Sequence, residues 1–241
     1  MTIRSLARRS RVARYMYTRS YALKAFTRAH SFAEAREDIL VQQIIGKVAF
    51  FVDIGAHDGI SGSNTFHFAR QGARGVCFEP VRWTFEKLRS LYGFNRRVVC
   101  RNVGISDRTR ELEIMAADFY SYLPETVDTQ RPIPPLKLKP ERIRLQTFAD
   151  AIDGLDIPDI VDLLSIDVEG HELNVLHSIP FNRYKFRAIV LETHLQNADG
   201  SHDWKHRDLE AIESLLSAQG YVFVRKTRVN TIYLACPPSS Y

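Results

Sequence analysis

Glycines and acids follow an apolar run near the start of this chain. Residues 50–59 read FFVDIGAHDG, in which the run ends at Asp53 and then breaks into Gly55 and Gly59. This pattern predicts a buried strand that ends in a tight turn beside a ligand. Glycine permits a sharp backbone turn, and the aspartate is placed to accept hydrogen bonds from a cationic group.

The turn differs from those that bind dinucleotides. Three residues separate its glycines, whereas the GxGxxG fingerprint is more compact, and one of the three, Asp58, is acidic. An acidic turn without lysine is a poor cradle for pyrophosphate. Glu79 ends the next predicted strand, where an acid can accept hydrogen bonds from both hydroxyls of a ribose. Together Asp53 and Glu79 predict a nucleoside ligand without phosphates, which favours S-adenosylmethionine (SAM) with its two cationic groups.

A second acidic group ends a later apolar run. Residues 165–172 read SIDVEGHE, and open α/β sheets bind ligands at the carboxyl ends of their strands. We therefore expect Asp167 and Glu169 to face the same crevice as Asp53 and to act in catalysis. For Glu172, a place in the first turn of the next helix, where acids favour the helix dipole, is explanation enough.

A histidine ends the strand after that. In Glu192-Thr-His194 the imidazole could take a proton from a substrate hydroxyl near neutral pH, so His194 joins the catalytic candidates. Asp167, Glu169, Glu192 and His194 could also hold a Mg²⁺-like cation, but no spacing is diagnostic, and a metal stays an open question.

Alternating strand and helix patterns must position these residues, at the pace of a doubly wound parallel sheet. The predicted core strands are 47–54, 75–79, 97–101, 160–166 and 186–191, with a terminal pair at 221–226 and 231–235. The predicted helices are 31–46 with Ser31 as its cap, 64–71, 82–92, 147–153, 171–178 and 203–219. Residues 111–116 and 142–146 are candidate extra strands. Residues 119–140 hold five prolines and no clear period, which predicts an insertion that could act as a lid.

Length and charge indicate one domain behind a basic arm. The 241 residues, 45% of them hydrophobic, suit a single α/β domain at 31–241. Residues 1–30 hold eight basic side chains and no acid, so the rest of the chain carries −3 of the total +5. The arm is interpreted in three ways that stay open: a solvated extension, an anchor to an anionic membrane or partner, or an organelle transit peptide.

Cysteine usage and hydropathy suggest a location. Cys77, Cys100 and Cys236 each lie in an apolar, strand-like context, which predicts buried thiols in a reducing, cytoplasmic compartment. No apolar run approaches 18 residues, so no membrane-spanning segment is expected.

Taken together, these motifs resemble the FkbM family of SAM-dependent methyltransferases. The resemblance runs from about residue 51 to 234, through VDIGAHDG, FEP at 78–80 and NVGISD at 102–107. LSIDVEGHELNVL at 164–176 is the most specific string, and IVLETH at 189–194 continues the match. Asn230 is similar to the asparagine that opens the family's last strand. One departure is that Ala149 follows Thr147-Phe148 where the family has an acid, and Asp150 comes one place later.

The resemblance implies a Rossmann-like class I methyltransferase, with a seven-stranded, mostly parallel sheet and helices on both faces. It also implies O-methylation of a hydroxyl on a sugar, glycan or polyketide-like small molecule. By motif position the glycine turn would surround the methionine part of SAM, and Asn102 would meet the adenine unless it only shapes a turn. The predicted cofactor-binding residues are Asp53, Gly55, Ala56, His57, Gly59, Asn64, Glu79, Asn102 and Asp167.

Two other functions stay open at this point. The basic arm could grip phosphates, which would suit methylation of RNA or another nucleic acid. Alternatively, the chain could be a SAM-binding domain that has lost catalysis and is tethered to an anionic membrane by the arm. The sequence defines no oligomeric state.

Overall fold

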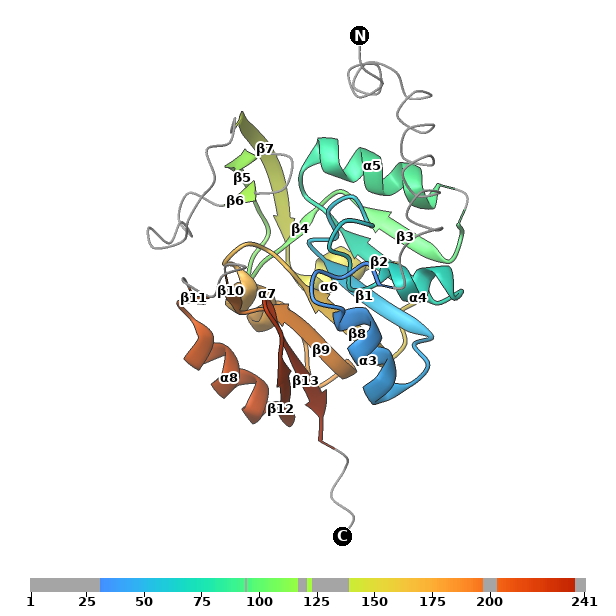
Figure 1. Ribbon diagram of the computed structural model, residues 1–241. Helices are drawn as coiled ribbons and strands as arrows, with labels where there is room; N and C mark the ends of the chain where they lie inside the picture. Colours follow the sequence, from blue (N-terminus) through green and yellow to red (C-terminus); the bar gives the residue numbers. More distant parts are fainter. Residues whose placement is uncertain (1–30, 94, 117–120, 123–138, 197–202, 237–241) are drawn as a thin grey trace.

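The computed structural model describes residues 31–93, 95–116, 121–122, 139–196 and 203–236 (Figure 1). The predicted basic arm and most of the predicted insertion lie outside the described residues. Both therefore remain predictions.

A seven-stranded sheet forms the centre of the molecule, in the order β12-β13-β9-β8-β1-β2-β3. Neighbouring strands from β3 to β9 are parallel, whereas β13 is antiparallel to both of its neighbours. The strands are β1 (Phe50–Ile54), β2 (Arg74–Phe78), β3 (Val98–Arg101), β8 (Ile160–Ile166), β9 (Lys185–Glu192), β12 (Tyr221–Lys226) and β13 (Asn230–Ala235). The predicted seven-stranded, mostly parallel sheet is thus confirmed.

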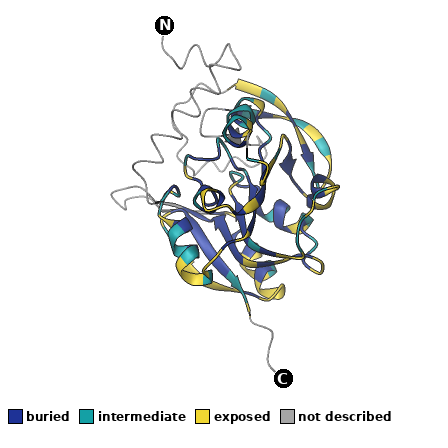
Figure 2. Cartoon of the chain, turned by 90° about the vertical axis from the view of Figure 1, so that its right-hand side faces the viewer, coloured by how far each residue is buried: buried dark blue, intermediate teal, exposed yellow. Residues whose placement is uncertain are grey.

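Helices cover both faces of this sheet, as Figure 1 shows. On one face lie α3 (Glu37–Ile45), α4 (Phe66–Arg70) and α5 (Arg82–Tyr92), which share a hydrophobic core with the strands. On the other lie α6 (Phe148–Ile152), α7 (Glu172–Ser178) and α8 (Leu209–Ala218), which share a second core. Burial on both faces explains why the central strands read as continuous apolar runs (Figure 2).

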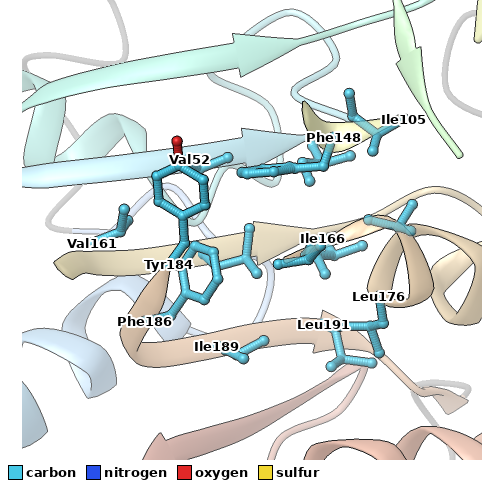
Figure 3. Close-up of a cluster of buried hydrophobic side chains, with 14 of the residues drawn as sticks. Val52, Ile105, Phe148, Val161, Ile166, Leu176, Tyr184, Phe186, Ile189 and Leu191 are labelled. Carbon is cyan, nitrogen blue, oxygen red and sulfur yellow. The ribbon is translucent and has the colours of Figure 1, made fainter. Parts of the chain in front are cut away.

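The second core is built mainly from large side chains of alternate strand positions. Val52, Ile166 and Leu191 point from β1, β8 and β9 toward Phe148 and its neighbours (Figure 3). Aromatic rings meet edge to face in this core, as between Phe148 and Phe186, whose centroids are 6.5 Å apart. The core fixes the strands below the edge at which the predicted site residues lie.

A smaller four-stranded sheet, ordered β4-β7-β5-β6, lies beside the start of α5. Its strands are β4 (Gly104–Ile105), β5 (Arg110–Ala116), β6 (Ser121–Tyr122) and β7 (Lys139–Gln146). Ile114, Ile143 and Leu145 pack there with Val81, the residue before α5. The two extra strands are confirmed and are longer than predicted. Residues at both ends of the predicted insertion belong to this sheet, because β6 pairs with β5 and Pro140 lies inside β7.

One predicted helix was wrong in its first third. Residues 203–205 form strand β11 (Asp203–Lys205), which pairs antiparallel with β10 (His194–Gln196), and α8 begins only at Leu209. The pairing partner lies in the segment after β9, so a tertiary contact overrides the local helical pattern.

The predicted helix start at Ser31 was also wrong. Helix α3 begins at Glu37, after Arg36 in a left-handed conformation with φ of 66°. The Ser31 hydroxyl donates to Asp38 Oδ1 at 2.6 Å, and the Phe32 N–H donates to Asp38 Oδ2 at 2.8 Å. Asp38, in the first turn of α3, therefore accepts hydrogen bonds from residues that precede the helix. The sequence had instead predicted that Ser31 would cap the helix.

The three cysteines differ in how far they are buried. Cys77 is buried and Cys100 half-buried, but Cys236 is exposed, because it lies just past the end of β13. This corrects the prediction that all three are buried.

Among the described residues, none of the helices is long and apolar enough to cross a membrane.

Candidate cofactor and acceptor site

Strand register brings the predicted site residues to one edge of the central sheet. Ile54, at the end of β1, is in register with the last residue of β2 and with the last residue of β8. The residues that follow these strands, Gly55, Glu79 and Asp167, therefore leave the sheet side by side. Glu192 and His194 leave from β9, the next strand along.

Protein contacts require the two glycines of the first turn. Gly55 has φ of +86°, and a Cβ there would lie 1.7 Å from the backbone oxygen of Asp167. Gly59 has φ of +80°, and its Cβ would lie 2.7 Å from Leu88 Cδ1 on α5. The turn can thus pass against the β8 turn and under α5 only with glycine at both positions.

Glu79 ties the end of β2 to this turn. Its Oε2 accepts from the His57 N–H at 3.0 Å, and its Oε1 accepts from the Val81 N–H at 2.8 Å. The Ala56 N–H donates to the carbonyl of Phe78, the residue before Glu79, at 3.0 Å. Burial raises the pKa of Glu79 to about 7, against a smaller opposing attraction from His57. Among the described residues, the Glu79 carboxyl at this edge has no lysine or arginine partner.

Asp58 stabilises the turn from within. Its Oδ1 accepts from the backbone N–H groups of Ile60 and Ser61 at 2.9 and 2.8 Å. Burial alone would raise the pKa of Asp58, but hydrogen bonding to His57 and the two backbone N–H groups holds it well below the usual range. The Asp58 carboxylate is thus hydrogen-bonded by backbone groups of its own loop.

Asp53 lies beneath the turn, on the face covered by α4 and α5. It is 5% exposed, and its Oδ2 accepts from the Thr65 hydroxyl at 2.5 Å. Burial raises the pKa of Asp53 to about 6, although hydrogen bonds from Thr65 and Ser165 lower it. Asn64 donates to the same Ser165 Oγ at 3.2 Å, but its buried Oδ1 has no hydrogen-bond partner among the described residues. A buried acceptor without a donor is costly, which marks a place for a ligand or water.

Asn102 has a clear structural role. Its Nδ2 donates to the backbone oxygens of Glu79 and Pro80, at 2.9 Å each. The amide therefore holds the segment that follows β2, as expected of a strand-end turn residue. Its contact with adenine stays a prediction.

The second acidic turn is joined to the first. The Asp167 N–H donates to the Ile54 oxygen at 2.9 Å, and the Asp167 side chain is exposed. Glu169 is half-buried in a left-handed conformation with φ of +58°. Left-handed backbone at a glutamate stores strain, and such positions cluster at functional sites.

Glu172 and His206 form a buried pair under this turn. Glu172 Oε1 accepts from the Val168 and Gly170 N–H groups at 3.1 and 3.3 Å. Its Oε2 lies 2.6 Å from His206 Nε2, and both side chains are fully buried. Burial would raise the pKa of Glu172, but hydrogen bonds from His206 and from the Val168 backbone N–H outweigh it and lower the pKa.

His206 was missed by sequence reasoning. Its Nδ1 accepts from the Asp208 N–H at 3.0 Å, so the proton of the neutral ring lies on Nε2, which donates to Glu172. Its backbone N–H donates to the Thr193 oxygen at 2.8 Å. The pair thus fastens the end of β8 to the end of β9 and to the start of α8. No local signal marks His206, because its partner lies 34 residues away.

His194 is held at the end of β9 by a chain of hydroxyls. It is 8% exposed, and its Nδ1 lies 2.7 Å from Thr193 Oγ1. Thr193 Oγ1 in turn lies 2.6 Å from Thr231 Oγ1 on β13. Glu192, 7% exposed, is in register with Asn230. Within the described part of the chain, no group of three or more His, Cys, Asp or Glu side chains could hold a metal ion.

Asp150 and Asn230 are engaged elsewhere. Asp150 accepts from the Thr109 hydroxyl at 2.8 Å, which together with Thr147 lowers its pKa. Asn230 opens β13 as the resemblance implied, and its Nδ2 donates to Glu37 Oε1 at 3.0 Å. Whether Asp150 replaces the family's displaced acid stays a prediction.

The sheet order and its acidic carboxyl edge define a Rossmann-like α/β protein of the class I methyltransferase type. The sequence profile of the methyltransferase FkbM domain matches residues 53–223. This match covers more than half of the chain, so the chain belongs to the FkbM methyltransferase family and is a SAM-dependent methyltransferase.

Solved structures of other methyltransferases are similar to this chain at low sequence identity. An O-methyltransferase from Bacillus cereus in complex with SAH aligns with a TM-score of 0.49 and 13% identity, over 91% of this chain and 88% of that chain. A precorrin-6y methyltransferase from Geobacter metallireducens aligns with a TM-score of 0.45 and 14% identity, over 87% and 93%. No curated protein sequence matches significantly.

Proposed function

We propose that this methyltransferase transfers the methyl group of SAM to a hydroxyl of a sugar, glycan or polyketide-like small molecule. The observation that carries the proposal is the set of hydrogen-bond acceptors at the carboxyl edge. Glu79, Asn64 and Asp167 present oxygens there, and among the described residues neither Glu79 nor Asn64 has a lysine partner. A ligand rich in donors and positive charge fits this edge better than a phosphorylated one.

The residues fit SAM in two specific ways. Each Glu79 oxygen accepts one backbone N–H, which leaves lone pairs on the carboxylate for the two ribose hydroxyls. The orphaned Asn64 Oδ1 supplies an acceptor for an ammonium group. When bound, SAM supplies an electrophilic methyl group on a sulfonium sulfur. The chain's own contribution is to hold the cofactor and the acceptor at near-attack distance, which is the main source of catalysis in a direct displacement.

The acceptor side of the site comes from β8 and β9. Asp167 and Glu169 follow β8, and His194 follows β9, so all three border the same edge. An acceptor hydroxyl must lose its proton when its oxygen gains a methyl group. We expect Asp167 or His194 to take it, and general-base assistance of this kind contributes about 10²–10⁴-fold.

The test is a methyl-transfer assay with labelled SAM against fractionated small-molecule and glycan extracts. Label in a hydroxyl-derived methyl ether is the expected product. His194→Ala should retain SAM affinity in calorimetry and lose about 100-fold in rate with the identified acceptor. Normal turnover of this variant would remove His194 from the mechanism, and label on nitrogen or carbon alone would refute O-methylation.

The charge of residues 1–30 motivates a second candidate, methylation of a nucleic acid. Eight basic residues without an acid could bind phosphates, and such binding weakens steeply as salt rises. Deleting residues 1–30 should then abolish RNA binding at low salt. No binding by the full chain, or binding indifferent to salt, would exclude this role.

The same arm motivates a third candidate, a membrane-tethered SAM-binding domain without activity. The acidic turn after β8 argues against it, because a binding domain has no need of Asp167, Glu169 and His194 at one edge. Turnover of SAM to S-adenosylhomocysteine with any acceptor would eliminate this candidate.

A further inference from the structure

Two cysteines lie side by side on neighbouring strands. In the parallel register of β2 and β3, Cys77 is the partner of Cys100. Register partners on parallel strands point to the same face of a sheet, and both cysteines pack in the core beneath α3, α4 and α5. Burial, and next a hydrogen bond with Cys100, raise the pKa of the Cys77 thiol well above its ordinary value. The two thiols are therefore in contact in the reduced protein.

The spacing of the two strands suits a disulfide. Neighbouring strands of a sheet lie about 4.8 Å apart, and a disulfide joins Cα atoms that are about 4.4–6.8 Å apart. Cys236 is distant from both thiols, because β1, β8 and β9 separate β13 from β2. All three cysteines lie in the described part of the chain, so the structure allows one disulfide within the chain, between Cys77 and Cys100.

The two thiols differ in their access to solvent. Cys77 is fully buried, whereas Cys100 is half-buried on β3, an edge strand of the sheet (Figure 1). A small oxidant therefore meets Cys100 first. The raised pKa keeps Cys77 in the thiol form, which is a poor nucleophile, so Cys77 reacts only when a modified sulfur lies next to it. An accessible cysteine beside a resolving cysteine is the arrangement found in redox sensors.

The cysteine pair lies one step below the predicted nucleoside site. Residues two apart in a strand share a face, so Cys77 lies below Glu79 at the end of β2. Cys100 lies in the same way below Asn102, whose Nδ2 donates to the Glu79 carbonyl at 2.9 Å. On its other side, Cys77 is in register with Asp53. A covalent bond between β2 and β3 at this level would therefore constrain the residues predicted to bind the ribose and the adenine.

We propose that Cys77 and Cys100 are a modification site, at which a small-molecule disulfide such as oxidised glutathione produces a reversible Cys77–Cys100 disulfide that weakens SAM binding. The Cys100 thiolate attacks one sulfur of the oxidant, whose S–S bond breaks, and one glutathione leaves as a thiolate. Cys77 then loses its proton to water and attacks Cys100 Sγ, which releases the second glutathione. Two protein thiols are thereby oxidised, and one glutathione disulfide is reduced to two glutathione molecules.

SAM binding and oxidation must affect each other to the same extent. If the disulfide lowers SAM affinity about tenfold, SAM must favour the reduced pair over the disulfide by the same factor. A tenfold factor in a two-electron couple corresponds to a shift of about 30 mV in reduction potential. SAM should therefore make the disulfide easier to reduce, as measured in glutathione buffers of graded redox potential.

Mass spectrometry identifies the disulfide directly. The Cys236→Ser variant, which lacks the exposed thiol, is incubated with oxidised glutathione, and the remaining thiols are then alkylated. The other two cysteines lie in the tryptic peptides 75–82 and 98–101. We expect these two peptides to be joined. Glutathione retained on Cys100 beside an alkylated Cys77 would overturn the proposal, as would alkylation of both cysteines.

Two further variants in the Cys236→Ser background assign the order of the steps. In Cys77→Ala the resolving thiol is absent, so glutathione should stay on Cys100. In Cys100→Ser the attacking thiol is absent, so Cys77 should stay reduced and unmodified. Modification of Cys77 in Cys100→Ser would contradict this order of attack, even if Cys77→Ala fails to fold.

Calorimetry tests the effect on the cofactor. Oxidised Cys236→Ser protein should bind SAM about tenfold more weakly than the reduced protein, and dithiothreitol should restore the affinity. Cys100→Ser in the same background is the matched control, and its SAM affinity should not change on treatment with oxidised glutathione. Equal SAM affinity in the oxidised and reduced protein would refute the effect on SAM. These measurements use no acceptor, so they can fail separately from the proposed O-methylation.

Discussion

Glu79 and Glu172 are buried carboxylates at the same edge of the sheet, but their surroundings treat the proton in opposite ways. Burial raises the pKa of Glu79 to about 7, because attraction from His57 and hydrogen bonds from two backbone N–H groups offset the burial only in part. Burial also opposes the charge of Glu172, yet His206 and backbone donors lower its pKa. The charged form of Glu79 therefore carries an energetic cost in the folded protein, whereas the charged form of Glu172 is stabilised by its neighbours.

Acids whose pKa the fold raises define a ligand side of the site, and acids whose pKa is lowered by protein partners define a framework side. Asp53 belongs with Glu79, because burial raises its pKa to about 6. Perturbed acids of this kind are common at functional sites, where stability is given up for binding. Glu172 fixes the turn that carries Asp167 and needs no ligand to complete its hydrogen bonds.

The largest expected effect is on the framework side. Glu172→Ala removes one partner of a buried pair and should lower the free energy of unfolding by about 3–5 kcal/mol. The pKa of Glu172 is lowered in the folded state, so its contribution is present above the ordinary value near 4.5 and fades on acidification below it. Denaturant melts at pH 7 and pH 4 measure both effects.

An exposed acid serves as the control for Glu172. Glu111 pairs with Arg142 at 3.0 Å on the surface, with side chains 56% and 78% exposed. Glu111→Ala should cost less than about 1 kcal/mol. Equal losses in the two variants would show that Glu172 is no more structural than a surface acid.

The next effect concerns the contact between the two turns. Gly55→Ala would place a Cβ 1.7 Å from the Asp167 backbone oxygen, so one turn must move. We expect a loss of about 2–4 kcal/mol in denaturant melts, together with lost SAM affinity in calorimetry. Gly154→Ala is the matched control, because φ is +71° there but no atom lies within 4 Å, and its cost should be about 1 kcal/mol. Comparable costs at the two positions would contradict the close contact.

The smallest effect has the opposite sign. Asp53 has a folded pKa of about 6 against an ordinary 3.8, so its favourable contribution is complete below pH 3.8 and is lost as pH rises through 6. Asp53→Asn should therefore be more stable than the natural protein at pH 8, by roughly 1–3 kcal/mol, and should not bind SAM. Thermal melts between pH 5 and 8 measure the gain, which should shrink toward pH 5.

Asp58 provides the matched control for Asp53. It lies five residues further on, and the fold lowers its pKa instead of raising it. Asp58→Asn should destabilise the protein at pH 8. A loss of stability in both variants would mean that Asp53 is a structural acid like Asp58.

The sheet and its edge could be predicted from the sequence because their signals are local. Residues 82–92 and 160–166 have the bounds expected from their apolar patterns. The acids could be predicted because they lie next to the ends of the apolar runs in the sequence. Glycine and acid spacing likewise placed Glu79 and Asp167 at one edge before the register was known. Parallel pairing then follows from the alternation of strands and helices.

The missed parts depend on contacts that are distant in sequence. Strand β11 exists because it pairs with β10, and His206 matters because Glu172 lies beneath it. The sequence also could not separate Asp58 from Asp53, although one is consumed by its own loop and the other is buried. Residue type and spacing predict where an acid lies, whereas the neighbouring groups in the fold determine whether its pKa is raised or lowered.

The central claim is that Glu79 is kept for the cofactor. Calorimetric titration of SAM into Glu79→Ala and Asp53→Ala, with Glu111→Ala as control, tests it most directly. We predict no detectable binding in the first two variants while their circular dichroism spectra remain those of the folded protein, and unchanged affinity in the third. Unchanged SAM affinity in both Glu79→Ala and Asp53→Ala would contradict the account.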